Sequence, residues 1–255
     1  MIDLQEEYAG FNLVLDRYDG VTVDTLELIE NKEDFEKKLL LLIEYLKTKN
    51  IKLLWITFTL ANSHFIEIAA QYKFSFHNCD SSYVMMVKEL VYEPIIPTAP
   101  THTIGVGVVV INEDNQILLI KERFSNIGYK LPGGHVDLGE KLQTAVCREV
   151  LEETGIIVEF ESIITLSSFH PHQFGKGNIY VLCNAKAKSS EINILDTEEI
   201  LEAKWMDVDL FLEHEDTFEY VKEIIQSSFN TKGLTTKELE FFNNLNIDCE
   251  LFFPN

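Results

Sequence analysis

Residues 133–156 read GGHVDLGEKLQTAVCREVLEETGI, and this segment is the strongest indication of the fold and function of the chain. The spacing of its apolar residues predicts a helix over roughly residues 141–154, after a loop that contains glycine. At about 100° per residue, one arc of this helix carries the carboxylates of Glu149, Glu152 and Glu153. The opposite side, which we expect to face a sheet, carries Cys147, Val150 and Leu151.

The shared arc of Glu149, Glu152 and Glu153 has two interpretations. Like charges at i, i+4 spacing destabilise a helix by a few tenths of a kcal/mol, and their proximity raises the pKa of each carboxyl group. A hard divalent cation reverses the sign of this interaction, because oxygen ligands suit Mg²⁺ or Mn²⁺. The alternative is a solvated acidic face, which is the favoured interpretation for an arbitrary E-x-x-E-E in so acidic a chain.

The wider spacing around the helix decides between these interpretations. The full pattern is Gly134, five residues, Glu140, seven residues, Arg148-Glu149, an aliphatic, any residue, Glu152-Glu153, any residue, Gly155 and an aliphatic. A chain of this length fills that pattern by chance on the order of once in a million sequences. The segment is identified as a Nudix box, and the chain resembles the Nudix hydrolases over most of residues 102–210.

This resemblance implies an α/β fold, specifically an α/β/α sandwich with a mixed sheet, that hydrolyses a nucleoside diphosphate linked to another group. The implied ligands of Mg²⁺ or Mn²⁺ are Glu149, Glu152, Glu153 and the carbonyl oxygen of Gly133. The resemblance also implies that Arg148 orients the carboxylates and that Glu140 supports the water shell of the metal. Because Asp137 and Glu140 have capping-box spacing, Glu140 has a second possible role at the start of the helix, and the two roles are compatible.

The residues that contact substrate and move protons are less sharply indicated. In the family the general base often lies on a loop beyond the box, which makes Glu198 and Glu199 candidates here, although Glu152 or Glu153 is an alternative. The expected substrate contacts are the cations Arg123 and Lys130 and the aromatic rings of Phe124 and Phe169. Further candidate substrate contacts of the same kinds are Lys121, Lys176, Tyr129 and Phe174. His135, His170 and His172 near the loop are less favoured candidates for the general base. For each lysine or arginine taken singly, a solvated charge is the more common role, and for each aromatic ring taken singly the core is the favoured interpretation. For Glu198 and Glu199, a solvated loop is an equally good interpretation.

Prolines divide the chain into domains. Three of the six prolines, Pro94, Pro97 and Pro100, fall within seven residues, and such a segment neither continues a helix nor donates to a sheet ladder. We therefore predict a pre-Nudix α/β domain, a proline-rich linker, a Nudix hydrolase domain and a C-terminal helical extension, over residues 1–93, 94–101, 102–230 and 231–255.

Hydrophobic periodicity predicts the elements of each domain. Upstream of the linker we expect strands at residues 10–15, 51–58 and 82–90 and helices at 33–48 and 62–73. Downstream we expect strands at residues 103–111, 116–121, 157–168, 179–185 and 203–206. The helices expected there cover residues 141–154, 218–229 and 236–245.

The N-terminal part narrows the resemblance to one subgroup. Residues 69–86 are similar to the domain that precedes the Nudix fold in the antisense fibroblast-growth-factor Nudix protein and in plant enzymes acting on ADP-ribose and NADH. That domain resembles a small acetyltransferase-type α/β layer without its chemistry. Residues 103–107, 130–134 and 169–176 continue the likeness. The plant enzymes often read Leu-Pro-Thr-Gly where this chain has LPGG at residues 131–134, so the resemblance does not fix a preference for NADH.

Composition excludes several classes of protein. Forty-two acidic residues against 21 basic ones give a net charge of −21, and no basic stripe is present, which disfavours nucleic acid as a partner. The longest aliphatic run is far shorter than the roughly 20 residues of a membrane helix. Four scattered cysteines without zinc-ligand spacing fit a reducing compartment. We expect a cytoplasmic protein without membrane partners.

Three functions are compatible with these observations. The leading hypothesis is a metal-dependent pyrophosphatase for a nucleoside diphosphate derivative, with ADP-ribose or a dinucleotide such as NADH first. The second is a regulator that senses a nucleotide, although an intact set of carboxylates argues against a pure sensor. The third is hydrolysis of RNA 5′ ends, against which the net charge counts. The family resemblance also allows a homodimer paired through N-terminal elements.

Overall fold

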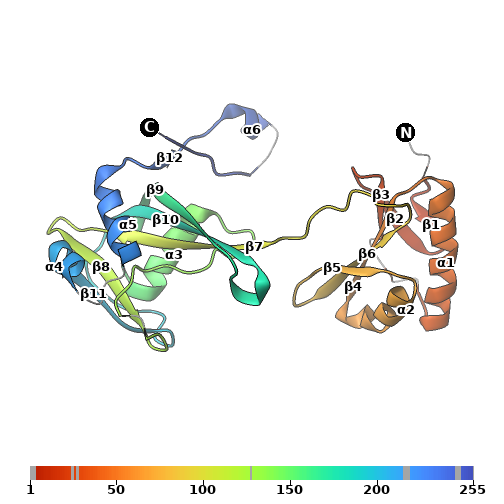
Figure 1. Ribbon diagram of the computed structural model, residues 1–255, viewed down its shortest axis with the longest axis horizontal. Coiled ribbons are helices and arrows are strands. Elements are labelled where there is room, and N and C mark those ends of the chain that lie inside the picture. The colour runs from red at the N-terminus through yellow and green to blue at the C-terminus, as the bar shows by residue number, and fades with distance from the viewer. Residues whose placement is uncertain are drawn as a thin grey trace. The chain divides into compact units, whose positions relative to one another are not determined.

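The structure is a computed structural model of the 255-residue chain, which describes residues 4–23, 26, 29–126, 128–214, 219–244 and 248–254. The chain divides into two compact units, Met1–Pro100 and Thr101–Asn255 (Figure 1). The division lies within the segment 94–101 that the prolines mark as a linker. Each unit has its own sheet and its own core.

The first unit is built on a six-stranded sheet with the order β1-β2-β3-β4-β6-β5. Its strands are β1 (Glu7–Tyr8), β2 (Phe11–Leu15), β3 (Gly20–Val23), β4 (Leu53–Thr59), β5 (Ser75–Cys79) and β6 (Tyr83–Glu89). The pair β3–β4 is parallel and the other pairs are antiparallel. The helix α1 (Lys32–Thr48) connects the two parallel strands, as such a crossover requires.

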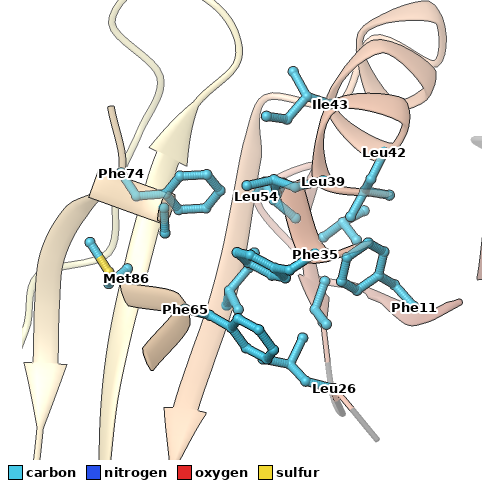
Figure 2. Packing of buried hydrophobic residues seen from close by; sticks show 14 of the residues in the cluster. Phe11, Leu26, Phe35, Leu39, Leu42, Ile43, Leu54, Phe65, Phe74 and Met86 are labelled. Atoms are coloured by element: carbon cyan, nitrogen blue, oxygen red, sulfur yellow. The ribbon is translucent and has the colours of Figure 1, made fainter. Parts of the chain in front are cut away.

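The core of the first unit lies between α1 and the sheet. The apolar stripe of α1 is buried at Phe35, Leu39, Leu42, Ile43 and Leu46. The Phe35 ring stacks on Phe65 with 4.6 Å between centroids and meets Phe11 edge-on at 6.4 Å. Figure 2 shows Phe35 at the centre of this cluster. The helix begins where Asn31 accepts a hydrogen bond from the Asp34 amide at 2.9 Å, which satisfies one of the free amides of the first turn.

The predicted elements of the first unit are present, with one helix divided. Residues 62–73 were expected to form a single helix capped by Asn62 or Ser63, but they lie in a 3₁₀ segment, η1 (Leu60–Phe65), followed by α2 (Ile66–Gln71). Periodicity does not indicate β3 and β5, because β3 has four residues and β5 is largely exposed on both faces.

The segment before the second unit packs on the first. Ile96 contacts the small cluster of Leu53, Trp55 and Val87. The His77 Nε2 atom lies 2.7 Å from the Pro97 carbonyl oxygen. The proline-rich segment is therefore anchored along part of its length.

The second unit contains a five-stranded sheet, β13-β12-β9-β10-β7, and a two-stranded sheet, β11-β8. Its strands are β7 (His102–Val110), β8 (Gln116–Glu122), β9 (Val158–Phe169), β10 (Gly177–Ala187), β11 (Ile200–Asp207), β12 (Leu234–Thr236) and β13 (Phe252–Pro254). The pair β10–β7 is parallel, whereas β10–β9 and β11–β8 are antiparallel. The sheet is mixed, as the sequence predicts.

Helices cover both faces of this unit (Figure 1). The helix α3 (Leu142–Thr154) packs on one face through Ala145, Val146 and Val150, against alternate residues of β7, β9 and β10. The other face is covered by α4 (Val208–Glu213) and α5 (Glu219–Asn230), through residues such as Phe211, Ile224 and Ile225. The second unit is therefore an α/β/α arrangement, and its two cores use opposite faces of the same strands.

Two predictions for the second unit need correction. Residues 231–255 were expected to be helical, but they form β12, a short helix α6 (Glu240–Asn244) and β13, and β12 pairs with β9 at Leu234↔Ile163. Of the predicted helices 218–229 and 236–245, Phe218 and Leu245 lie outside the described residues, and Thr236 belongs to β12. The one-turn helix α4 is too short for periodicity to reveal, although Asp207 caps it.

In the described ranges, no helix is both long enough and apolar enough to cross a membrane.

Candidate active site

The loop before α3 approaches β7 so closely that it needs glycine. Gly133 has φ +145°, and a Cβ atom there would lie 2.0 Å from the Val106 carbonyl oxygen. A Cβ atom on Gly134 would lie 2.6 Å from Glu149 Oε1. The loop is fixed to β7 by a 2.8 Å hydrogen bond from the Val106 amide to the Gly134 carbonyl. Glycine therefore lets backbone and carboxylate meet at this point.

Glu153 is the buried member of the acidic arc. It is 5% exposed, and its Oε2 accepts a hydrogen bond from the Gly133 amide at 2.7 Å. Burial raises the pKa of this carboxyl group to about 8, although the Gly133 amide and the Lys130 charge oppose the shift. At neutral pH and without a cation, Glu153 is therefore largely protonated.

Glu149 and Glu152 extend the arc from the interior to the surface. The Glu149 side chain is 12% exposed and that of Glu152 is 48% exposed. Burial raises the pKa of Glu149, against the lowering effect of the neighbouring Arg148. The expected opposite face is partly wrong, because Leu151 is exposed whereas Val150 is buried. The core side of α3 is rotated toward Glu153, which explains why an acidic residue is buried.

The guanidinium group of Arg148 forms hydrogen bonds with three glutamates of the box. Its Nε and Nη2 atoms bond both carboxylate oxygens of Glu140, at 2.9 and 2.8 Å. Its Nη1 donates to Glu149 at 2.9 Å and to Glu152 at 3.1 Å. Its guanidinium holds the pKa of Glu140 below the usual range. Arg148 thus lies where it can orient two of the three carboxylates.

Glu140 does not cap the helix in the way that its spacing suggests. The helix begins at Leu142, after Glu140, although Glu140 does accept a hydrogen bond from the Asp137 amide at 3.1 Å. The first-turn amides of Leu142 and Gln143 donate instead to Glu250, at 2.5 and 3.2 Å. Sequence reasoning missed Glu250 because it lies 108 residues from Leu142 along the chain.

A cavity of about 350 Å³ opens beside the glycine loop. Charged residues and glycines make up part of its lining, and aromatic and amide side chains make up another part. Its lining consists of Gly105, Glu122, Lys130, Gly133, Gly134, His135, Phe169, His172, Gln173, Asn178, Tyr180, Glu199 and Tyr220. The size is within the range of pockets that hold small ligands.

Of the four expected substrate contacts, two line the cavity and two do not. Lys130, paired with Glu122, and Phe169 both line the cavity. Arg123 does not, because its Nη2 donates to the carbonyl oxygens of Thr197 at 3.0 Å and Ile200 at 3.4 Å. Arg123 therefore secures the loop before β11.

Phe124 belongs to a neighbouring cavity. Its ring is highly exposed and borders a space of about 470 Å³ together with Glu122, Asp196, Glu198 and Glu199. Glu199 borders both cavities, whereas Glu198 borders this second one alone. The negative charge of Glu199 also raises the pKa values of Glu149 and Glu153. Of the two candidate bases, Glu199 is the one placed beside the carboxylates.

Of the remaining candidates from the sequence, some line the cavity and others lie outside it. His135 and His172 border the first cavity, whereas His170 lies against His102, with 6.3 Å between ring centroids. Tyr129 packs in the core, with Lys204 3.7 Å above its ring and Lys121 at 6.0 Å. Phe174 and Lys176 are exposed outside the lining.

The cavity also contains residues that the sequence did not indicate, among them Asn178, Tyr180 and Tyr220. Asn178 and Tyr180 are alternate residues of β10 and share a face of the strand. A polar residue in a strand is usually assigned to solvent, so its position on the cavity floor depends on the pairing of β10 with β7, which a single sequence does not show.

The carboxylates fit a divalent cation by their chemistry. In the described part of the chain, no three side chains are already gathered in a metal-binding cluster. The charge of Glu149 nevertheless raises the pKa of Glu153, the charge of Glu152 raises the pKa of Glu149, and the charge of Glu199 raises both. Crowded oxygen donors whose charge is unfavourable are the donors that Mg²⁺ and Mn²⁺ bind.

Comparison with known proteins gives matches in both units. A family model described as NUDIX domain matches residues 101–226, and another described as Nudix hydrolase domain matches residues 11–90. The chain is 31% identical over 204 residues to Nudix hydrolase 8 of Arabidopsis thaliana, covering 78% of this chain and 55% of that protein. The aligned region is thus just over half the length of that relative.

Two further relatives match over more of their length. Nudix hydrolase 7 of Arabidopsis thaliana is 32% identical over 206 residues, covering 78% of this chain and 72% of that protein. The human protein Nucleoside diphosphate-linked moiety X motif 6 is 29% identical over 243 residues, covering 88% of this chain and 76% of that protein. The similarity therefore extends beyond the box into the first unit.

Proposed function

The chain belongs to the Nudix hydrolase family of pyrophosphohydrolases, and on this basis we propose that it cleaves a nucleoside diphosphate derivative with the help of a divalent metal. ADP-ribose and NADH-like dinucleotides are the first substrates to test. The observation that carries the proposal is Glu153, a carboxyl group buried against the Gly133 amide at the edge of a ligand-sized cavity. A buried acid of this kind costs stability unless a ligand compensates for it.

Each residue of the box has a separate task in this proposal. Glu149, Glu152, Glu153 and the Gly133 carbonyl would hold Mg²⁺ or Mn²⁺, and the bound ion would neutralise phosphate charge and lower the pKa of a bound water. Arg148 is held from one side by Glu140 and keeps the carboxylates of Glu149 and Glu152 in orientation. The bidentate contact with Glu140 fixes the plane of the guanidinium.

Proton transfer is assigned to Glu199. Its exposed carboxylate borders the cavity and adds to the negative field around Glu149 and Glu153. In this position it can accept a proton from an attacking water molecule. Glu153 loses its own proton before it binds a cation, so its raised pKa makes cation binding favourable toward higher pH.

Lys130 supplies the positive charge for the substrate. Among the residues that line the described cavity, it is the one lysine or arginine, and it is paired with Glu122. We propose that Lys130 exchanges this partner for a phosphate oxygen. Because the lining also carries the carboxylates of Glu122 and Glu199, an anionic substrate depends on Lys130 and the metal together.

The first unit supports the subgroup assignment. We propose that residues 1–93 are the pre-Nudix domain, residues 94–101 its linker and residues 102–230 the hydrolase domain. The match over residues 11–90 supports this division. The four cysteines of the described structure are free thiols, which supports a reducing, cytoplasmic location.

The test is a substrate panel with product identification. The full chain is incubated with Mg²⁺ and ADP-ribose, NADH, NAD⁺, CoA, FAD, diadenosine polyphosphates, nucleotide sugars and capped RNA. We expect release of AMP from ADP-ribose. We expect at least about a 100-fold loss of turnover in Glu152→Gln and in Glu153→Gln, because even residues that only support a metal ligand typically contribute 10–100-fold.

The control is Glu161→Gln, the same change at an exposed position of β9, which should keep full turnover. Full turnover by both site variants would refute the metal assignment. Tight nucleotide binding without hydrolysis of any compound would assign the chain to regulation instead, and selective hydrolysis of capped RNA would assign it to RNA 5′ ends.

A further inference from the structure

One buried amide in the lining of the cavity has an unpartnered oxygen. Asn178 borders the cavity and is 5% exposed. Its Nδ2 donates to Thr103 Oγ1 at 3.0 Å, across the parallel pair β10–β7. Its Oδ1 is buried and has no hydrogen-bond partner among the described residues. An unsatisfied buried acceptor is costly, and a ligand that brings a donor removes that cost.

Two aromatic rings of the lining lie near Asn178, because Phe169 is paired with Asn178 across β9 and β10 and the Tyr220 ring contacts Phe169. Phe169 at the end of β9 is 43% exposed, and Tyr220 in the first turn of α5 is 42% exposed. Their centroids are 6.1 Å apart with the rings nearly perpendicular. The Tyr220 hydroxyl lies 2.6 Å from Ser167 Oγ, which fixes the ring. Half-exposed rings that border a cavity offer a surface on which a planar base can stack.

Strand β10 connects the surroundings of Asn178 with those of the carboxylates. Asn178 and Tyr180 lie on the same face of β10, about 7 Å apart along the strand. Tyr180 in turn lies close enough to Glu153 for that charge to raise its pKa, after the larger effect of burial. The absence of side chains at Gly105 and Gly107 makes room for the Tyr180 ring. A ligand whose phosphates reach the carboxylates therefore has its nucleoside near Asn178.

We propose that Asn178, Phe169 and Tyr220 form the nucleoside subsite, and that Asn178 selects a 6-aminopurine over a 6-oxopurine. This inference rests on the proposed function for the placement of the phosphates. Because Nδ2 is engaged by Thr103, the free Oδ1 accepts a hydrogen bond from the exocyclic amino group of adenine. The carbonyl oxygen of hypoxanthine would instead place two acceptors against each other.

Binding of AMP and IMP tests the selection without turnover, because neither nucleotide contains a pyrophosphate bond. Titration calorimetry of the full chain in Mg²⁺ should give AMP about tenfold tighter than IMP. In Asn178→Ala this preference should disappear. The matched control is Asn184→Ala on the same strand, outside the cavity lining, which should keep the preference.

A second variant covers the case in which Asn178→Ala does not fold. Phe169→Leu, at a half-exposed position, should weaken AMP and IMP several-fold alike, because stacking does not distinguish the two bases. Phe174→Leu is its control, since that ring is exposed outside the lining and should leave both affinities unchanged. An effect at Phe174 equal to that at Phe169 would overturn the subsite.

The outcomes separate this inference from the proposed function. Equal binding of AMP and IMP by the unmodified chain, or an unchanged ratio in folded Asn178→Ala, would overturn the subsite even if ADP-ribose is hydrolysed; water would then satisfy the amide. An Asn178-dependent preference for AMP without hydrolysis of any compound would support the subsite and refute the proposed activity.

Discussion

The two units bury different kinds of side chains. In the first unit, every buried residue among those the structure describes is apolar. The buried polar and charged residues of the described chain all belong to the second unit: Glu153, Thr154, Ser162 and Asn178. The buried residues of the first unit contribute mainly packing, whereas the second unit buries polar residues whose desolvation costs stability.

Thr154 and Glu153 differ in how well their buried polar atoms are hydrogen-bonded, and this difference shows which residues cost stability. Thr154 is satisfied within its own helix, because its Oγ1 donates to the Val150 carbonyl oxygen at 2.5 Å. Glu153 receives one amide hydrogen bond, and its pKa is still raised. Asn178 has an unpaired oxygen. Glu153 and Asn178 both adjoin the cavity, which is the arrangement expected when a ligand completes a site. In the first unit, the described residues include one further buried side-chain atom without a hydrogen-bond partner, Nδ1 of His77.

The largest expected effect is a loss of stability in the core of the first unit. Phe35→Ala removes the central ring of that core and should lower the free energy of unfolding of the first unit by about 3–5 kcal/mol. Trp55 lies in the first unit and Trp205 in the second. Urea unfolding followed by Trp55 fluorescence in a Trp205→Phe background reports the first unit.

Phe76→Ala is the control, because that ring is exposed and its loss should change stability by less than about 0.5 kcal/mol. Similar losses in both variants would show that the cluster around Phe35 is not the core that stabilises the first unit.

A smaller effect of opposite sign is expected in the second unit. Glu153→Gln should raise the free energy of unfolding at pH 8 in a chelating buffer, by roughly 1–4 kcal/mol. The folded state keeps the Glu153 proton up to a pH of about 8, whereas the unfolded chain loses it near 4.5. The free energy of unfolding of the unmodified second unit therefore falls as the pH rises through this window, and Gln removes that slope.

Trp205 fluorescence in a Trp55→Phe background measures the effect, with Glu161→Gln as the control that keeps the slope. If Glu153→Gln and the unmodified chain show the same dependence on pH between 5 and 8, the burial of Glu153 contributes nothing to the contrast between the units.

Local patterns predicted the elements and the chemistry of the box. The apolar spacing of α3 and the Pro-rich boundary are properties of neighbouring residues, and Gly155 ends α3 in the left-handed conformation that the sequence indicates. The arc of Glu149, Glu152 and Glu153 follows from helical geometry alone.

The burial of each carboxylate was not predictable, because it depends on contacts with residues that are distant in the sequence. Glu153 is buried by Gly133, twenty residues earlier, and the helix start is capped by Glu250, far along the chain. Asn178 reaches the cavity through the pairing of β10 with β7. Arg123 was expected to bind substrate, but it is engaged by carbonyl groups of a loop that precedes β11.

The central claim is that a divalent cation binds where Glu153 is buried, and proton release on Mn²⁺ binding tests it most directly. Titration calorimetry at pH 7, in two buffers of different ionisation enthalpy, counts the protons released. We predict up to about one proton per chain, because the folded-state pKa of Glu153 is about 8. Glu153→Gln should release none and bind Mn²⁺ more weakly. Equal Mn²⁺ affinity in the two proteins, with no proton released by either, would contradict the account.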